Sequence, residues 1–289
     1  MISPVKMVAL CAAAVLALSA CSEAEDDLPD ADPRDFPEGS TMKALAEAGT
    51  ITIGTTFELP LFGFLPDDGA LTGFDVEMGT IIAAELGIGP DAITWVETLA
   101  SNREAFIEGG QVDIVAATYT INDDRKDSVS FAGPYYTAGQ AMMVLATNDD
   151  VTGPEDMASL NVCSVEASTP AEYLRTNYPD ATLVLFGNSA DCLEPLRRGD
   201  VDVVTTDNVI LAGYVNASDG EFALVGEPFT EEHYGIGLAR EDTQFRMWIN
   251  DVLEETYADG RWREAWNSTA GVALRETSPP PVDRYELDD

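Results

Sequence analysis

The sequence predicts an α/β protein made of two similar lobes. Short runs rich in β-branched residues alternate with helical patterns along most of the chain, which is typical of α/β layers. The length of 289 residues corresponds to about two domains at ~150 residues each. Residues 110–118 (GQVDIVAAT) resemble residues 199–207 (GDVDVVTTD), and each segment follows a helical pattern, turns at glycine and enters a strand. This repeat indicates two lobes of the same type; the alternative is a chance similarity between two ordinary helix–strand units.

The separate elements follow from hydrophobic periodicity. Residues 50–55 (TITIGT) alternate as a strand. A helix is predicted from Asp75, with apolar residues on one face at positions 78, 81, 82 and 86 and an end at Gly87. We predict further strands at residues 92–97, 112–116, 161–165, 182–186, 201–205 and 234–239, and helices at 103–108, 190–198, 245–257 and 262–266.

The composition excludes several classes of function. The chain has 52 acidic and 15 basic residues and a formal net charge of −37, which repels phosphate backbones and excludes nucleic-acid binding. One histidine and four cysteines supply too few ligands for the usual zinc sites, so we expect no metal and no cofactor. An apolar share of 45 % is that of an ordinary globular protein rather than a disordered one.

The first 20 residues have the pattern of an export signal. A positive charge precedes an apolar run at residues 7–18, which is too short to anchor the chain across a bilayer. The run ends in Leu18-Ser19-Ala20-Cys21, which resembles the lipobox of bacterial lipoproteins, so we expect Cys21 to carry lipid at the outer face of the cell membrane. The alternative is an ordinary secretory signal with Cys21 incidental. Residues 21–40 are acidic and proline-containing, which predicts a flexible tether.

The cysteine count then predicts one disulfide. Cys11 leaves with the signal and Cys21 takes lipid, so Cys163 and Cys192 remain in an oxidising compartment. A bond between them would close a loop of about 29 residues. The alternative is two reduced cysteines in the core.

Two strand ends mark a candidate site. Thr118 and Asp207 end the two repeated segments, and ligands of open parallel sheets bind beyond the carboxyl ends of strands. The two residues would therefore face a shared cleft, one from each lobe. Asp207 offers a negative partner for an ammonium group.

Two helix starts add groups that bind carboxylates. Arg125 lies in the first turn of a helix that Thr120 or Asn122 can cap, where a cation is unfavourable unless an anion lies nearby. Its guanidinium fork suits a carboxylate. Ser168-Thr169-Pro170 has the same pattern, with a hydroxyl cap and proline at the first helical position. With Asp207, these groups fit the zwitterion of a free amino acid; the alternative is that Arg125 and Asp207 form ordinary solvated ion pairs.

Five stretches in combination resemble a known family. From about residue 51 to residue 271 the chain is similar to family 3 of the solute-binding proteins of amino-acid ABC importers, and most similar to the actinobacterial glutamate-binding lipoproteins. The stretches are Gly73-Phe74-Asp75-Val76, residues 110–113, residues 119–125, Phe131-Ala132-Gly133-Pro134-Tyr135-Tyr136 and residues 201–207.

The resemblance implies a two-lobed periplasmic-binding-protein-like fold of type II, in which two crossover strands join two α/β lobes. We expect lobe 1 at residues 41–139 and 234–275, lobe 2 at 140–233, and crossovers near 140–145 and 232–238. Residues 276–289 would form a disordered acidic, proline-rich tail. The implied partners are an amino acid, an ABC permease with its ATPase, and the membrane through the lipid anchor, for a protein that is itself a monomer.

The resemblance also implies roles for particular residues. Arg125 would hold the α-carboxylate and Asp207 the ammonium group, while Arg103 would hold a side-chain carboxylate. The other implied contacts are main-chain or hydroxyl groups of the two lobes and the first loop, at Ala117, Thr118, Thr120, Ser168, Thr169, Thr56 and Phe57.

Two positions depart from the family pattern. Glu166-Ala167 stands where most relatives have glycine before the lobe-two hydroxyls, and Leu59 replaces an aromatic residue that often stacks on the ligand. An inward Glu166 would disfavour an anionic side chain.

L-glutamate is the expected ligand, with aspartate, glutamine and asparagine as weaker competitors. Arg103 carries this choice; the alternative is that it pairs with Glu104 or Glu108 on an exposed helix face. We expect no enzymatic activity. A ligand-gated sensor, or a dehydratase-like enzyme that uses Glu166, is the alternative function.

Overall fold

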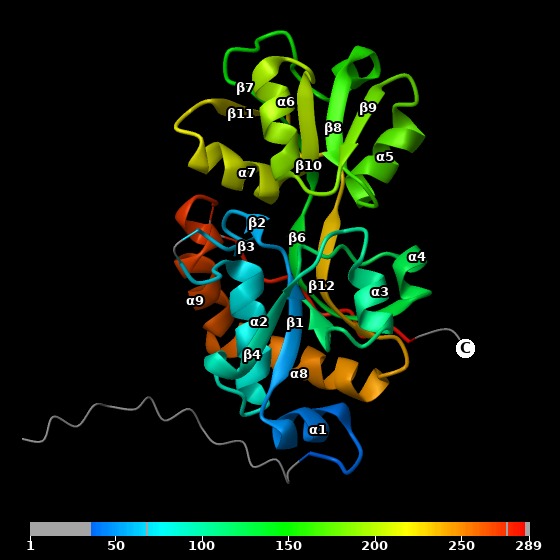
Figure 1. Ribbon diagram of the computed structural model, residues 1–289, viewed down its shortest axis with the longest axis vertical. Helices are drawn as coiled ribbons and strands as arrows, with labels where there is room; N and C mark the ends of the chain where they lie inside the picture. Colours follow the sequence, from blue (N-terminus) through cyan, green and yellow to red (C-terminus); the bar gives the residue numbers. More distant parts are fainter. Residues whose placement is uncertain (1–35, 68, 276, 287–289) are drawn as a thin grey trace, which may run out of the picture.

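The structure is a computed structural model that describes residues 36–67, 69–275 and 277–286. Figure 1 shows two lobes stacked along the long axis, each built on its own sheet. The predicted signal, the lipid attachment at Cys21 and most of the predicted tether lie outside the described residues. Within the described ranges, no helix has the length and apolar character needed to cross a membrane.

Lobe 1 is built on a mixed five-stranded sheet with the order β4-β1-β5-β12-β6, in which the first three strands are parallel and the last two antiparallel. Two short strands, β2 (Glu58–Leu59) and β3 (Gly63–Phe64), form a hairpin beside it. The sheet strands are β1 (Ile51–Thr55), β4 (Ile93–Glu97), β5 (Ile114–Val115), β6 (Val129–Ala138) and β12 (Glu232–Ala239), and the helices are α1 (Thr41–Ala48), α2 (Phe74–Glu85), α3 (Arg103–Glu108), α4 (Asp123–Lys126), α8 (Thr243–Asp259) and α9 (Arg261–Ser268).

Lobe 2 repeats this arrangement. Its sheet order read from the opposite end is β9-β8-β10-β7-β11, with the same succession of parallel and antiparallel pairs. The two similar sequence segments lead into β5 and β10, which are the central strands of the two sheets, so the repeat reflects the fold. The strands are β7 (Gln140–Leu145), β8 (Asn161–Val165), β9 (Thr182–Phe186), β10 (Val203–Asp207) and β11 (Phe222–Val225), and the helices are α5 (Thr169–Asn177), α6 (Leu193–Arg198) and α7 (Asn208–Ala217).

The chain passes between the lobes at two places. It crosses at Gly139, between β6 and β7, and returns at residues 226–231, between β11 and β12. The crossovers were expected near 140–145 and 232–238, and the two passages lie directly before these ranges. Residues 140–145 and 232–238 themselves pair with neighbouring strands of their own lobes, with an irregularity in β12 between Tyr234 and Ile236. An extended apolar segment has the same pattern whether it links two sheets or belongs to one.

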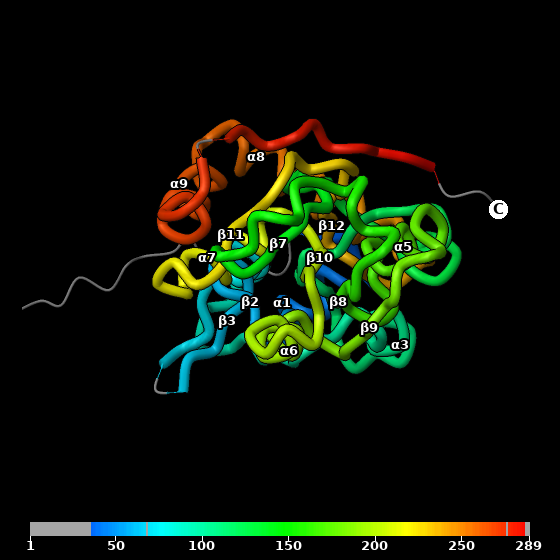
Figure 2. Tube along the Cα trace, turned by 90° about the horizontal axis from the view of Figure 1, so that it is seen from above, coloured from blue at the N-terminus to red at the C-terminus, as the bar shows by residue number. Residues whose placement is uncertain are grey.

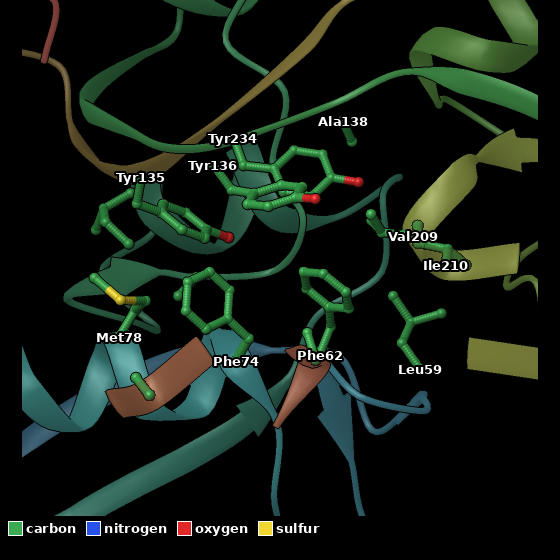
Figure 3. Close-up of a cluster of buried hydrophobic side chains, with 14 of the residues drawn as sticks. Leu59, Phe62, Phe74, Met78, Tyr135, Tyr136, Ala138, Val209, Ile210 and Tyr234 are labelled. Atoms are coloured by element: carbon green, nitrogen blue, oxygen red, sulfur yellow. The ribbon is translucent and has the colours of Figure 1, made fainter. Parts of the chain in front are cut away.

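An aromatic cluster lies where lobe 1 meets lobe 2. Figure 3 shows Phe62 facing Phe74, Tyr136 and Tyr234, and Phe62 meets all three edge-on with ring centroids 6.1–6.2 Å apart. Ile210, from α7 of lobe 2, belongs to the same buried cluster. The hydrophobic core is thus continuous across the two lobes.

The C-terminal residues 277–286 are bound to lobe 1, in contrast to the expected disorder (Figure 2). The Tyr285 hydroxyl accepts a hydrogen bond from the Phe131 amide at 2.8 Å, and its carbonyl accepts one from Arg246 at 2.6 Å. The Arg246 guanidinium and the Lys126 ammonium each lie 4.3 Å from the centroid of the Tyr285 ring. The composition predicted disorder, because composition does not show that Tyr285 contacts residues that are distant in the sequence.

The predicted disulfide is confirmed. Cys163 on β8 is bonded to Cys192, with a Cα–Cα distance of 5.9 Å, and both residues are fully buried. The bond ties β8 to the turn that precedes α6.

Candidate ligand site

A pocket lies between the lobes, at the carboxyl ends of their parallel strands. It encloses about 500 Å³, with the solvent at its mouth included. Among the sequence-predicted residues, the pocket is lined by Thr56, Arg103, Ala117, Thr118, Thr120, Ser168, Thr169 and Asp207. Arg125 lines an adjoining, wider hollow instead, and Phe57 lines neither. The Phe57 carbonyl accepts from the Leu65 amide, beside the β2–β3 hairpin.

Arg103 starts α3 and is almost completely buried, with 5 % of its surface exposed. Its Nη1 donates to the Ala117 carbonyl at 3.0 Å, and its guanidinium carbon lies 3.9 Å from the centroid of the Tyr119 ring. Its buried Nε has no hydrogen-bond partner among the described residues. Arg103 therefore does not pair with Glu104 or Glu108 on an exposed face, and it retains a donor for an anion.

Arg125 lies on α4, where Asn122, rather than Thr120, caps the backbone amide of Arg125 at 2.9 Å. The guanidinium donates to the Thr120 carbonyl at 2.6 Å and makes longer contacts of 3.5 Å to the Ala167 carbonyl and 3.6 Å to Glu104. Burial, and next the charge of Arg103, lowers the pKa of Arg125 to about 10. The side chain stays charged at neutral pH, and its two long contacts can exchange for a ligand carboxylate.

Tyr119 connects the two arginines. Its ring lies under the Arg103 guanidinium and 5.2 Å from that of Arg125, and its hydroxyl donates to Glu104 at 2.6 Å. Glu104 thus contacts Arg125 and the Tyr119 hydroxyl, and the two guanidinium groups concentrate positive charge beside the pocket of a strongly acidic protein.

Asp207 ends β10 and is buried on the opposite side of the pocket. Its Oδ2 accepts from the Tyr234 hydroxyl at 2.5 Å, and its Oδ1 has no partner among the described residues. Burial, followed by the charge of Glu232, raises the pKa of Asp207 to about 7. A buried acceptor of this kind suits an ammonium group, whose charge would favour the ionised carboxylate.

A second buried acid shapes the main chain between the arginines and Asp207. Thr118 adopts a left-handed conformation with φ 44°, and its amide donates to Asp75 at 2.8 Å. Tyr135 donates to the other oxygen of Asp75 at 2.5 Å. Burial raises the pKa of Asp75 to about 6. Since the Thr118 amide is already bonded, Thr118 can serve a ligand through its carbonyl or hydroxyl.

The lobe-two hydroxyls are already engaged within the protein. Ser168 caps α5 as predicted, accepting from the Ala171 amide at 3.2 Å, and Thr169 donates to Glu232 at 2.7 Å. Ala167 has φ 58°, the left-handed region that glycine adopts without strain, which accounts for the glycine of the family pattern. Glu166 is exposed and outside the pocket lining, so it does not oppose an anionic ligand.

Sequence reasoning did not single out several lining residues. Residues 99–100 follow β4 and residues 187–189 follow β9. Like Thr118 and Asp207, they lie beyond the carboxyl ends of parallel strands, and this position is the signal that identifies them. Glu58 lies in the two-residue strand β2, where no periodicity marks it. The remaining lining residues of this kind are Val165, Thr206 and Ile210.

Comparison with known families decides the relationship. Residues 51–268 match the family of bacterial extracellular solute-binding proteins, family 3. The chain belongs to this family. Its two lobes with matching mixed sheets are the type II periplasmic-binding fold that the sequence predicted.

Named relatives of this family-3 protein bind amino acids. It is 37 % identical to the glutamate-binding protein GluB of Corynebacterium efficiens over 279 residues, covering 92 % of this chain and 91 % of that protein. It is 30 % identical to the ABC transporter glutamine-binding protein GlnH of Bacillus subtilis, covering 78 % and 83 % of the two chains. Among solved structures, an ancestral arginine-binding protein bound to glutamine matches with a TM-score of 0.72 and 31 % identity, covering 76 % of this chain and 97 % of the other.

Proposed function

We propose that this protein captures an amino acid, L-glutamate in first place, outside the cytoplasm and delivers it to an ABC import permease and its ATPase. The observation that carries the ligand is the pair of guanidinium groups on one tyrosine ring, opposite a buried carboxyl group with an unpartnered oxygen. This arrangement offers two sites for anions and one for a cation, which is the charge pattern of glutamate.

Each charge of glutamate has a candidate partner. Asp207 would accept from the α-ammonium group, and Arg125 would exchange its long contacts for the α-carboxylate. Arg103 would bind the side-chain carboxylate through guanidinium N–H groups other than the one bonded to the Ala117 carbonyl. Because two guanidinium groups lie close together, a ligand with two carboxylates relieves their mutual repulsion better than one with a single carboxylate.

The names of the relatives support the same class of ligand, since GluB is a glutamate-binding protein and GlnH a glutamine-binding one. Glutamine, aspartate and asparagine are accordingly the competitors to test. No observation favours a dehydratase-like enzyme, because Glu166, the acid considered for that role, is exposed outside the pocket.

A thermal-shift screen against the twenty amino acids tests the proposal. A ligand present at 100 times its Kd stabilises the folded state by about 2.7 kcal/mol, so glutamate should give a clear increase in Tm. Arg103→Met should reduce the preference for glutamate over glutamine, whereas Arg197→Met, at an exposed arginine of α6, should leave it unchanged. No stabilisation by any amino acid would contradict the function, and tighter glutamine binding across pH 6.0–8.5 would contradict the choice of glutamate.

We further propose that the protein is anchored through lipid on Cys21. The lipobox-like sequence at residues 18–21 supports this proposal. The variant Cys21→Ala should be released from the membrane into the soluble fraction while still binding its ligand. Wild-type protein that partitions with the soluble fraction would contradict the anchor.

A further inference from the structure

One acidic side chain of this pocket would, if ionised, repel the side-chain carboxylate of an acidic ligand. Glu58, on β2 of lobe 1, lines the pocket. Tyr214, from α7 of lobe 2, donates to the Glu58 carboxylate and, at 3.3 Å, to the Glu58 carbonyl. The Ser189 backbone amide is a second donor to the same carboxyl group. Glu58 is therefore held from lobe 2 at two points when the lobes are together.

Glu58 and Asp207 belong to different ends of the pocket. Ser189 follows the edge strand β9, whereas Asp207 ends β10, two strands away in the sheet order. Adjacent strands are about 4.8 Å apart, so the two ends are separated by about 10 Å, roughly the span of a glutamate from its ammonium group to its side-chain carboxylate with a hydrogen bond at each end. With the α-ammonium group at Asp207, the side-chain end of the ligand reaches the region of Glu58.

The environment of Glu58 keeps both of its protonation states accessible. Burial raises its pKa to about 7, the bonds from Tyr214 and Ser189 oppose this, and the charges of Glu97 and Asp191 add to it. Arg103 is the cation that lines the same pocket. The protonated carboxyl can donate a hydrogen bond, whereas the carboxylate can only accept.

We propose that Glu58 is a specificity-determining residue that contacts the distal group of the ligand, donating to a side-chain carboxylate when protonated and accepting from a side-chain amide when ionised. The inference rests on the proposed amino-acid binding and deepens it. Protonated Glu58 and Arg103 together supply donors to both oxygens of a carboxylate. Ionised Glu58 and Arg103 supply one acceptor and one donor, which match the NH₂ group and the oxygen of an amide.

The consequence is a ligand preference that changes with pH. Glutamate binding favours the protonated form and so raises the pKa of Glu58, whereas glutamine binding favours the ionised form and lowers it. The affinity ratio of glutamate to glutamine should therefore fall as pH rises through 7, by about tenfold for each unit by which the two pKa values differ. The titration of Asp207 cancels from this ratio, because the two ligands share the α-ammonium group.

Calorimetric titration of both ligands at pH 6.0, 7.0 and 8.5 tests the inference on the full-length mature protein. We expect the ratio to fall about tenfold or more across this range in the wild type and to be independent of pH in Glu58→Gln. Glu166→Gln removes the same charge from an exposed position beside the cleft and should keep the wild-type dependence. Tyr214→Phe removes a donor to the carboxylate and should move the midpoint of the change to higher pH.

The outcomes separate the two proposals. If neither ligand binds at any pH, the proposed function is wrong. If both bind with a ratio that does not depend on pH, or if the dependence persists in Glu58→Gln, the role of Glu58 is wrong while the function stands. If Glu58→Gln does not fold, an unshifted midpoint in Tyr214→Phe overturns the inference.

Discussion

Tyr234 of lobe 1 donates a hydrogen bond of 2.5 Å to Asp207 of lobe 2. Tyr234 lies on β12, directly after the second passage between the lobes, and its ring packs in the aromatic cluster beside Phe62. The bond fixes one oxygen of the carboxyl group, while the other is buried without a hydrogen-bond partner among the described residues. The orientation of the Asp207 carboxyl group thus depends on how the two lobes are placed relative to each other.

Asp207→Asn should separate binding from folding. The amide retains an acceptor for Tyr234 but loses the charge, so a ligand ammonium group would be left without its ionic partner. We expect a loss of about 2–5 kcal/mol in binding, or at least about 30-fold in Kd, measured by calorimetry. The Tm without ligand should not fall, because a carboxyl group with a penalty for burial is removed. Wild-type affinity in Asp207→Asn would remove this residue from the site.

Asp75 should make the ligand-free protein less stable as pH rises from about 4 to 6. Its pKa is raised from 3.8 to about 6 by burial, so in this window the unfolded chain ionises while the folded one stays protonated. The stabilisation contributed by protonated Asp75 is fully present below about pH 4 and is lost as pH rises through about 6. In Asp75→Asn the slope of unfolding free energy against pH should be less negative by up to about 1.4 kcal/mol per pH unit. Denaturant titrations at intervals of half a pH unit would detect this, and equal slopes would exclude Asp75 as the source.

Removal of the disulfide should destabilise lobe 2. Cys163 and Cys192 are 29 residues apart in sequence, and the chain-entropy estimate for such a loop is about 3–4 kcal/mol. The double variant Cys163→Ala/Cys192→Ala should unfold at lower denaturant concentration than the wild type. As the matched comparison, wild-type protein unfolded in the presence of a reductant should likewise unfold at lower denaturant concentration than without it. Two thiols that react with an alkylating agent in the native, oxidised protein would contradict the bond.

Tyr285→Ala should weaken the attachment of the C-terminal residues to lobe 1. The change removes one hydrogen bond and two contacts between a cation and the ring, which together are worth about 2 kcal/mol. We expect a lower Tm with an unchanged glutamate/glutamine ratio, since Tyr285 lies outside the pocket lining. Glu286→Gln, at the exposed neighbour, should keep the wild-type Tm. An unchanged Tm in Tyr285→Ala would mean that these contacts contribute nothing to stability.

The local sequence pattern was sufficient to predict the two lobes and the site residues at the ends of strands. Thr118 and Asp207 could be found because each ends a β-branched segment after a glycine turn, and this signal lies within ten residues. Arg103 came from resemblance, and its burial against Tyr119 could not be read from a helix start with acidic neighbours.

Contacts between distant segments could not be predicted. The partner of Asp207 is Tyr234, and Glu58 meets Tyr214 far along the chain, so no local pattern joins either pair. The binding of residues 277–286 was missed for the same reason. Phe57 was expected in the pocket because it lies in the first loop, but it is outside the pocket lining.

The two passages between the lobes also set the order in which the chain can fold. Lobe 2 is one uninterrupted stretch, so its sheet can be completed as soon as β11 has been synthesised. The sheet of lobe 1 needs β12, which lies between β5 and β6 and follows all of lobe 2 in the sequence. The later segment therefore closes the earlier lobe, and a chain interrupted before β12 would present an unfinished sheet with exposed strand edges to its neighbours.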